Sequence, residues 1–377
     1  MLTYLGCSAL AVFTSTVVLL LLDTLPFLAA THFILAVAIL PLIFGAIAHF
    51  VPVLTRSGKP HRAVLLAPLL LQVSGLLVFL HFYGRLGPGA LLAAVVTSLP
   101  VCLGFVGWLI ARARHTLGKP HPGWRWYLAA LLCLTIGLAL VPAMQFWPEA
   151  RQELRGLHLH LNLLGFVGLT AIGTLQVLLP TILSGPDIDA AVRLRRDLPL
   201  AVAGVLLVSL GAAFGWPLSL PGAGLLIFAV CRLGLAWLRR YGLRVLIGDG
   251  ASASLLAALF GFLLILVFGT AHAFGVMGGH DTVLACMAVF LLPLVTGALS
   301  QLMPVWRHPG RRTEARDQMR AVLVQGGAIR ALLFISGGSL LAIGLSAGYW
   351  LTAAGLLMFL YGIVRAFCFP GAEQNGI

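Results

Sequence analysis

Five histidines in this sequence lie at the borders of long apolar runs, where an imidazole could bind a metal. His32 opens one run, His158 and His160 open another, and His272 and His280 flank the gap between two later runs. Imidazole is a favoured axial ligand of haem iron and also suits copper. A single histidine here is more typical of an interfacial residue bonded to a loop carbonyl. An ionisable side chain beside a membrane span is energetically unfavourable, however, and such residues usually have a function. Four histidines at matching positions therefore favour ligation.

His158 and His160 are two residues apart, which is about 200° of rotation on a helix. They are therefore expected to face opposite ways and to serve two separate centres rather than one ion. Asp281 could accept a hydrogen bond from a ligating imidazole and fix its tautomer. Asn162 is a second candidate for such support, although hydrogen bonding between helices is the commoner use of an amide in a span.

A repeated motif relates the runs that carry these histidines, since a glycine precedes a proline by seven residues three times. The copies are Gly45–Pro52, Gly173–Pro180 and Gly297–Pro304. His32 and His160 each stand thirteen residues before the glycine, and His280 stands one turn earlier than that position. The spacing predicts internal repeats at approximately 1–120, 121–246 and 247–377, each with four spans. Chance matching of residues that are common in membrane helices is the alternative.

The composition indicates that these elements lie in a membrane. Of 377 residues, 60% are hydrophobic and 9% are charged, and the mean hydropathy is +1.04; a soluble domain carries about 25% charged residues. We expect an all-α membrane protein of about twelve transmembrane helices, forming one transmembrane domain over 1–377 in a lipid bilayer. The runs are approximately 3–22, 30–54, 63–82, 89–111, 125–147, 157–183, 198–215, 218–238, 252–271, 281–305, 325–343 and 347–369.

Basic residues predict the orientation. When the loops are assigned to alternate sides, one side receives most Lys and Arg, and the other receives Arg85, Arg151 and Arg155. Both termini are therefore expected in the cytoplasm, as for a protein of the bacterial inner (cytoplasmic) membrane. The formal charge of +13 is spread over several loops, which argues against a nucleic-acid partner. The first Lys or Arg is Arg56, so the first run lacks the basic start of a signal peptide and is expected to be retained.

The remaining polar residues are expected at the membrane surfaces. His49, His61, His115, His121 and His308 are interpreted as solvated loop residues of the cytoplasmic side. All eleven acidic residues are expected in loops or at span ends, which weakens the case for proton- or sodium-coupled transport.

The segment that starts at His158, HLHLNLLGFVGLTAIGTLQVLLPTILSG, resembles the haem-ligating helix of haem–copper oxidase catalytic subunits (subunit I). It has H-x-H at its start, glycines along its length and a proline at position 23. The segment from Thr31 to Pro52 is similar to the other low-spin haem-ligating helix of that family. The resemblance implies twelve spans in three pseudo-threefold arcs of four. It also implies a haem, b-type by preference, and a quinol or a cytochrome as electron partner.

The chain departs from that family at the copper site. The run 198–215 has no histidine, there is no H-P-E-V-Y segment, and the H-x-H lies on the sixth run instead of the tenth. The resemblance implies that His32 and His280 bracket the iron, or that His160 or His158 pairs with one of them if the site has rotated. A second cofactor, haem or copper, would use the remaining histidines, including His272. A complete oxygen-reducing centre is not expected.

Together these features predict a haem-binding membrane protein, with or without copper, that acts in respiratory electron transfer or in oxygen or nitric oxide handling. Some haem- and copper-containing membrane proteins linked to nitric oxide also have twelve spans and scattered histidines. The alternatives are a twelve-span transporter and a cofactor-free, oxidase-like assembly or accessory factor.

Overall fold

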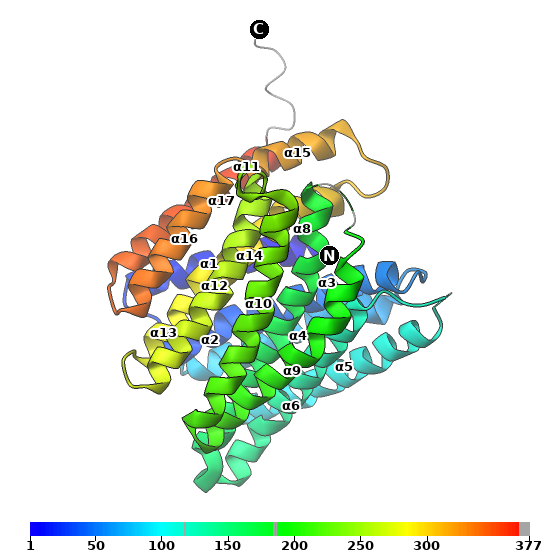
Figure 1. Cartoon of the computed structure of the whole chain (residues 1–377). Coiled ribbons are helices and arrows are strands. Elements are labelled where there is room, and N and C mark those ends of the chain that lie inside the picture. Colours follow the sequence, from blue (N-terminus) through cyan, green and yellow to red (C-terminus); the bar gives the residue numbers. More distant parts are fainter. Residues whose placement is uncertain (117, 184, 186, 369–377) are drawn as a thin grey trace.

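The computed structural model describes residues 1–116, 118–183, 185 and 187–368 of the chain, and every regular element in these ranges is a helix. Twelve helical stretches are long and apolar enough to cross a membrane. This confirms the prediction of an all-helical membrane protein with twelve spans. The helices run side by side, with α11 and α15 at one end of the bundle and α13 toward the other (Figure 1).

The spans, numbered 1 to 12 in chain order, are α1 (Leu2–Leu21), α2–η1–α3 (Phe27–Leu54), α4 (Arg62–Phe82), α5 (Gly89–Arg114), α6 (Gly123–Phe146), η2–α7–η3–α8 (Pro148–Leu183), α9 (Ala190–Phe214), η4–α10 (Trp216–Tyr241), α12 (Gly250–Ala273), α13–η5–α14 (Gly279–Arg307), α15–α16 (Glu314–Ala342) and α17 (Ala347–Cys368). A short helix, α11 (Leu243–Gly248), joins spans 8 and 9.

Two spans begin earlier than their apolar runs predict. Span 6 begins at Pro148 and span 7 at Ala190, eight or nine residues before the run. In span 11 the helix of the apolar run begins at Gly327, and α15 (Glu314–Val324) is a separate helix before it. Charged residues such as Arg and Glu are good helix formers, so the helix continues through them beyond the apolar stretch. Asp197 lies near the start of α9, at a span end as expected, but it is buried, with 2% of its surface exposed.

Spans 2, 6 and 10 each change from α-helix to π-helix and back. The segments are α2 (Phe27–His32), η1 (Phe33–Ile39) and α3 (Leu40–Leu54); α7 (Arg151–His160), η3 (Leu161–Gly168) and α8 (Leu169–Leu183); and α13 (Gly279–Cys286), η5 (Met287–Leu291) and α14 (Leu292–Arg307). Each π segment ends five or six residues before the glycine of the repeated motif. Two neighbouring helices approach these segments through glycines, Gly75 at the carbonyl of Ala36 and Gly261 at that of Val289, where a Cβ atom would clash. Such π turns are frequent at functional sites.

The same three spans form the interior together with span 9. In the most apolar stretch of spans 2, 6, 9 and 10, 61% to 72% of the residues are buried within the protein, against 22% to 44% in the other eight. The outer spans contact one another in chain order, since α5 packs on α6, α9 packs on α10, and α17 returns to α1. The bundle is therefore closed around its π-containing helices.

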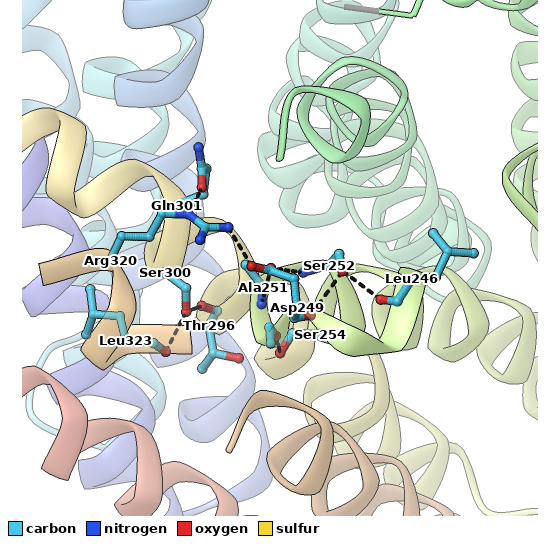
Figure 2. Close-up of polar contacts among 11 residues, drawn as sticks. Leu246, Asp249, Ala251, Ser252, Ser254, Thr296, Ser300, Gln301, Arg320 and Leu323 are labelled. Atoms are coloured by element: carbon cyan, nitrogen blue, oxygen red, sulfur yellow. Dashed lines mark hydrogen bonds and ion pairs between the residues drawn. The ribbon is translucent and has the colours of Figure 1, made fainter. Parts of the chain in front are cut away.

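One end of the bundle, which we call the arginine end, is held together by charged hydrogen bonds between loops and helix termini. Figure 2 shows Arg320 of α15 donating to Gln301 of α14 (2.7 Å) and to Asp249 (2.6 Å). Asp249 in turn caps α12 by accepting from the backbone N–H groups of Ala251 and Ser252. These bonds satisfy the first N–H groups of α12 and fix α15 across the ends of two spans.

Candidate functional site

Six histidines lie at the other end of the bundle, which we call the histidine end. They are His32 at the end of α2, His81 at the end of α4, His158 and His160 in the last turn of α7, His272 at the end of α12, and His280 in the first turn of α13. They come together because antiparallel spans return to the same side at every second loop. Five of them are the residues that the sequence singles out.

The imidazoles of five of these histidines are fixed in the same way, with Nδ1 beside a backbone carbonyl oxygen. The bonds are His32 Nδ1 to Leu28 O (2.8 Å), His158 Nδ1 to Gly137 O (2.8 Å), His160 Nδ1 to Gly156 O (2.9 Å), His272 Nδ1 to Met277 O (2.9 Å), and His81 Nδ1 to Leu86 O and Gly87 O (3.1 Å each). A carbonyl can only accept, so Nδ1 carries the proton in each ring. In the neutral ring Nε2 then keeps its lone pair, and no described residue donates to it.

His32 and His158 belong to different spans and lie within electrostatic range of each other, and His81 is within range of His32 as well. The ring of His32 stacks on Phe82 with a centroid distance of 4.4 Å. His158 bonds across to Gly137 of α6. These contacts place His32 and His158, from spans 2 and 6, in one region of the histidine end.

His160 faces another neighbour, since it lies within electrostatic range of His272 of α12. Its Nδ1 proton goes to Gly156 of its own helix. Gly156 also lets α7 approach α9 closely, because a Cβ there would meet the carbonyl of Ala212. The different partners of His158 and His160 agree with the rotation expected from their two-residue spacing.

His280 differs from the other five histidines. Its ring stacks on Phe27 of α2 at a centroid distance of 4.0 Å, and the side chain makes no hydrogen bond to any described residue. Asp281 lies beside Gly278 at the start of α13 and accepts from no histidine in the described part of the chain. Its predicted support of a ligating imidazole stays a prediction.

Asn162 packs against His158 and α6. Its Nδ2 donates to the backbone carbonyl of His158 (2.7 Å) and lies 3.3 Å from His158 Nδ1. Since that Nδ1 already carries a proton for Gly137, the second contact is steric. Asn162 fits closely against Gly137, where a Cβ would meet the amide. It therefore holds the turn that carries His158.

The structure corrects the interpretation of one histidine, His49, and adds another to the candidate site, His81. His49 is not a solvated loop residue, because it lies inside α3 with its ring against Phe50 and edge-on to Trp306. His81 was missed, because it lies outside the spacing of the repeated motif. The signal that could have found it is the alternation of spans, which puts the end of span 3 on the same side as the start of span 2.

Among the described residues, no group of three or more His, Cys, Asp and Glu side chains is arranged to hold a metal ion. A haem takes its axial ligands from one or two side chains of the protein, and the pairs of histidines described above have the chemistry of such ligands. Comparison of the chain with protein-family models, with curated proteins and with solved structures returns no match.

Proposed function

We propose that this chain is a haem-binding integral membrane protein of the haem–copper oxidase subunit I-like type, in which histidines of spans 2 and 6 hold a b-type haem. The observation that carries the proposal is the common state of the imidazoles. Each ring has its Nδ1–H fixed by a backbone carbonyl and its Nε2 lone pair free. A hydrogen bond of this kind orients a metal-ligating histidine and sets its tautomer.

His32 and His158 are the preferred axial pair, because they lie in different spans within electrostatic range. The alternative pair of His32 and His280 has less support, since the His280 ring stacks on Phe27 and no carbonyl fixes it. His160 and His272 form a second pair, which would take a second haem or a copper ion.

The surrounding residues keep these rings ready to bind. The carbonyls of Leu28 and Gly137 hold the protons on Nδ1, which leaves each Nε2 unprotonated in the neutral ring. Phe82, stacked on His32, restricts rotation of that ring. When bound, haem would supply one-electron chemistry by cycling its iron between the ferrous and ferric states.

The proposal includes three pseudo-threefold arcs of four spans. It is supported by the repeated glycines, each of which packs against the first span of its own group. Gly45 meets Leu5 of α1, Gly173 meets Trp126 of α6, and Gly297 meets Leu255 of α12. The π segments of spans 2, 6 and 10 lie at corresponding positions. In this arrangement the histidines of spans 2 and 6 occupy equivalent places in neighbouring arcs.

We place the protein in a bacterial inner membrane with the arginine end and both termini in the cytoplasm, because Lys and Arg are retained on that side. The histidine end then faces outward. A quinol or a cytochrome would deliver or remove electrons there, in respiratory electron transfer or in oxygen or nitric oxide handling.

The experiment is purification of the full chain in mild detergent, followed by absorption spectra of the oxidised and reduced protein and by metal analysis. A Soret band with a bis-histidine reduced spectrum, and a b-type pyridine haemochrome, are expected. Colourless protein without bound iron or copper would overturn the proposal. It would leave a transporter or a cofactor-free accessory factor as the function.

A further inference from the structure

A cleft of about 450 Å³ opens at the arginine end, between the first turns of α9 and the last turns of α10. Its walls carry four arginines, Arg193, Arg196, Arg232 and Arg239. It lies away from the histidine end, because the two helices reach the opposite side of the bundle only at Phe214 and Trp216. The haem proposal does not use this cleft.

The carboxylates around the cleft do not neutralise its guanidinium groups. Asp187 pairs with Arg193 (2.5 Å) and Arg240 (3.1 Å), while Asp197 pairs with Arg196 (3.0 Å) and Arg232. Asp189 reaches only Arg240, at 3.7 Å. Arg239 has no ion pair with any described residue. Five guanidinium groups thus face three carboxylates, which leaves a surplus of two positive charges.

Some donors at the cleft also lack acceptors. Arg193 is 8% exposed, and its Nε–H has no hydrogen-bond partner in the described part of the protein. The Nε–H of Arg232 is buried and unpartnered as well. A buried charged donor without an acceptor is destabilising. An anion in the cleft would supply further acceptors for these guanidinium groups.

Apolar side chains beside the arginines indicate which kind of anion fits. Val192 is 54% exposed and Leu235 is 50% exposed, and both line the cleft. Exposed apolar side chains at the end of two spans are available to contact the apolar part of a lipid. A ligand that satisfies both parts of the cleft has an anionic head and apolar chains. Basic pockets between spans on the cytoplasmic side bind lipid head groups by this combination.

We propose that the cleft between α9 and α10 binds an anionic phospholipid, with its phosphate among the four arginines of the walls, Arg196 and Arg239 included, and its acyl chains along Val192 and Leu235. Arg239 supplies the free positive charge, and guanidinium groups of the walls donate to phosphate oxygens. A zwitterionic lipid is bound less well, because its ammonium group would add to the positive surplus.

The test uses the full chain in lipid nanodiscs or detergent, with native mass spectrometry of retained lipid. Phosphatidylglycerol is expected to be retained in preference to phosphatidylcholine. The double variant Arg196→Gln/Arg239→Gln should lose about tenfold or more of this preference, because each arginine near a membrane surface contributes about 1 kcal/mol. The matched control Arg311→Gln/Arg312→Gln, which removes two exposed arginines at the same end, should change it less than about twofold.

Two further arms keep the outcome interpretable. Arg196→Lys/Arg239→Lys preserves the charge and should keep most of the preference, and inorganic phosphate at millimolar concentration should not displace the lipid. Equal retention of the two lipids, an equal loss in the control, an equal loss in the lysine variant, or displacement by free phosphate would each overturn the proposal. Thermal unfolding of each variant in phosphatidylcholine checks that the fold is intact.

Discussion

At the arginine end, guanidinium and carboxylate groups from different helices satisfy most of one another's hydrogen bonds, as in the contacts of Arg320 with Asp249 and Gln301 (Figure 2). At the histidine end, by contrast, the backbone fixes one nitrogen of each of five imidazoles and leaves the other free. Satisfied polar groups hold structure together, whereas a lone pair left free at a fixed orientation is prepared for a ligand. The comparison assigns packing to the contacts of Arg320 at the arginine end, while the proposed haem site lies at the histidine end.

The largest expected effect concerns the histidine end. His32→Ala and His158→Ala should each lower the haem content of purified protein at least about 10-fold, since even changes outside the ligand set cost 10- to 100-fold in metal affinity. His160→Ala should differ from His158→Ala, because the two rings face different spans. The ratio of Soret absorbance to protein concentration measures the haem content of each variant.

The control for that experiment is His61→Ala, which lies just before α4 at the opposite end of the bundle and should keep its full haem content. Equal and complete retention of haem in the variants of His32, His158, His160 and His280 would rule out the site. Loss in His280→Ala together with His32→Ala, but not in His158→Ala, would restore the pair that the family resemblance implies.

The sequence predicts the twelve spans because hydropathy depends only on the residues of each run. It does not predict the π segments, because these arise where helices press together, as at Gly75 and Gly261. The histidines of spans 2 and 6 could be identified from their shared distance to the repeated glycine. Their hydrogen bonds could not, since the carbonyl that fixes His158 belongs to another helix, at Gly137.

Charges within helices mark another limit of the sequence. Arg232 and Arg330 lie inside apolar runs, so they are not among the loop charges that predict the orientation. In the structure Arg232 pairs with Asp197, while Arg330 is 1% exposed against the ring of Phe359. Which buried charge has a partner depends on neighbouring helices, so it becomes visible only in three dimensions.

A second prediction tests the packing role of the arginine end. Asp197→Ala should lower the free energy of unfolding by about 3 kcal/mol, because it removes a buried carboxylate and leaves Arg196 and Arg232 without their shared partner. Asp317→Ala, which breaks the exposed pair with Arg312, should cost about 0–1 kcal/mol. Thermal unfolding in detergent compares the two. Similar losses of unfolding free energy in the two variants would show that the buried ion pairs of Asp197 are no more stabilising than the exposed pair of Asp317.

A smaller effect is expected at Arg330, whose buried Nε and Nη2 have no hydrogen-bond partner in the described protein. Arg330→Met should leave the unfolding free energy unchanged or raise it by about 1 kcal/mol, since the cost of an unpaired buried charge outweighs the contact with Phe359. Arg320→Met should instead lower it by about 1–3 kcal/mol, because Asp249 and Gln301 lose their donor. If Arg330→Met proves as destabilising as Arg320→Met, Arg330 has a partner, such as a bound anion.

The smallest effect concerns pH at the arginine end, where His121 precedes α6. Burial, together with the positive charge of Arg195, lowers the pKa of His121 below its ordinary value. The unfolded chain therefore binds a proton more readily than the folded protein, and this contribution to stability is lost as the pH falls below about 6.5. The midpoint of thermal unfolding should drop between pH 7.5 and pH 5.5, and His121→Gln should make that drop smaller. An unchanged drop in the variant would mean that other groups account for the whole pH dependence.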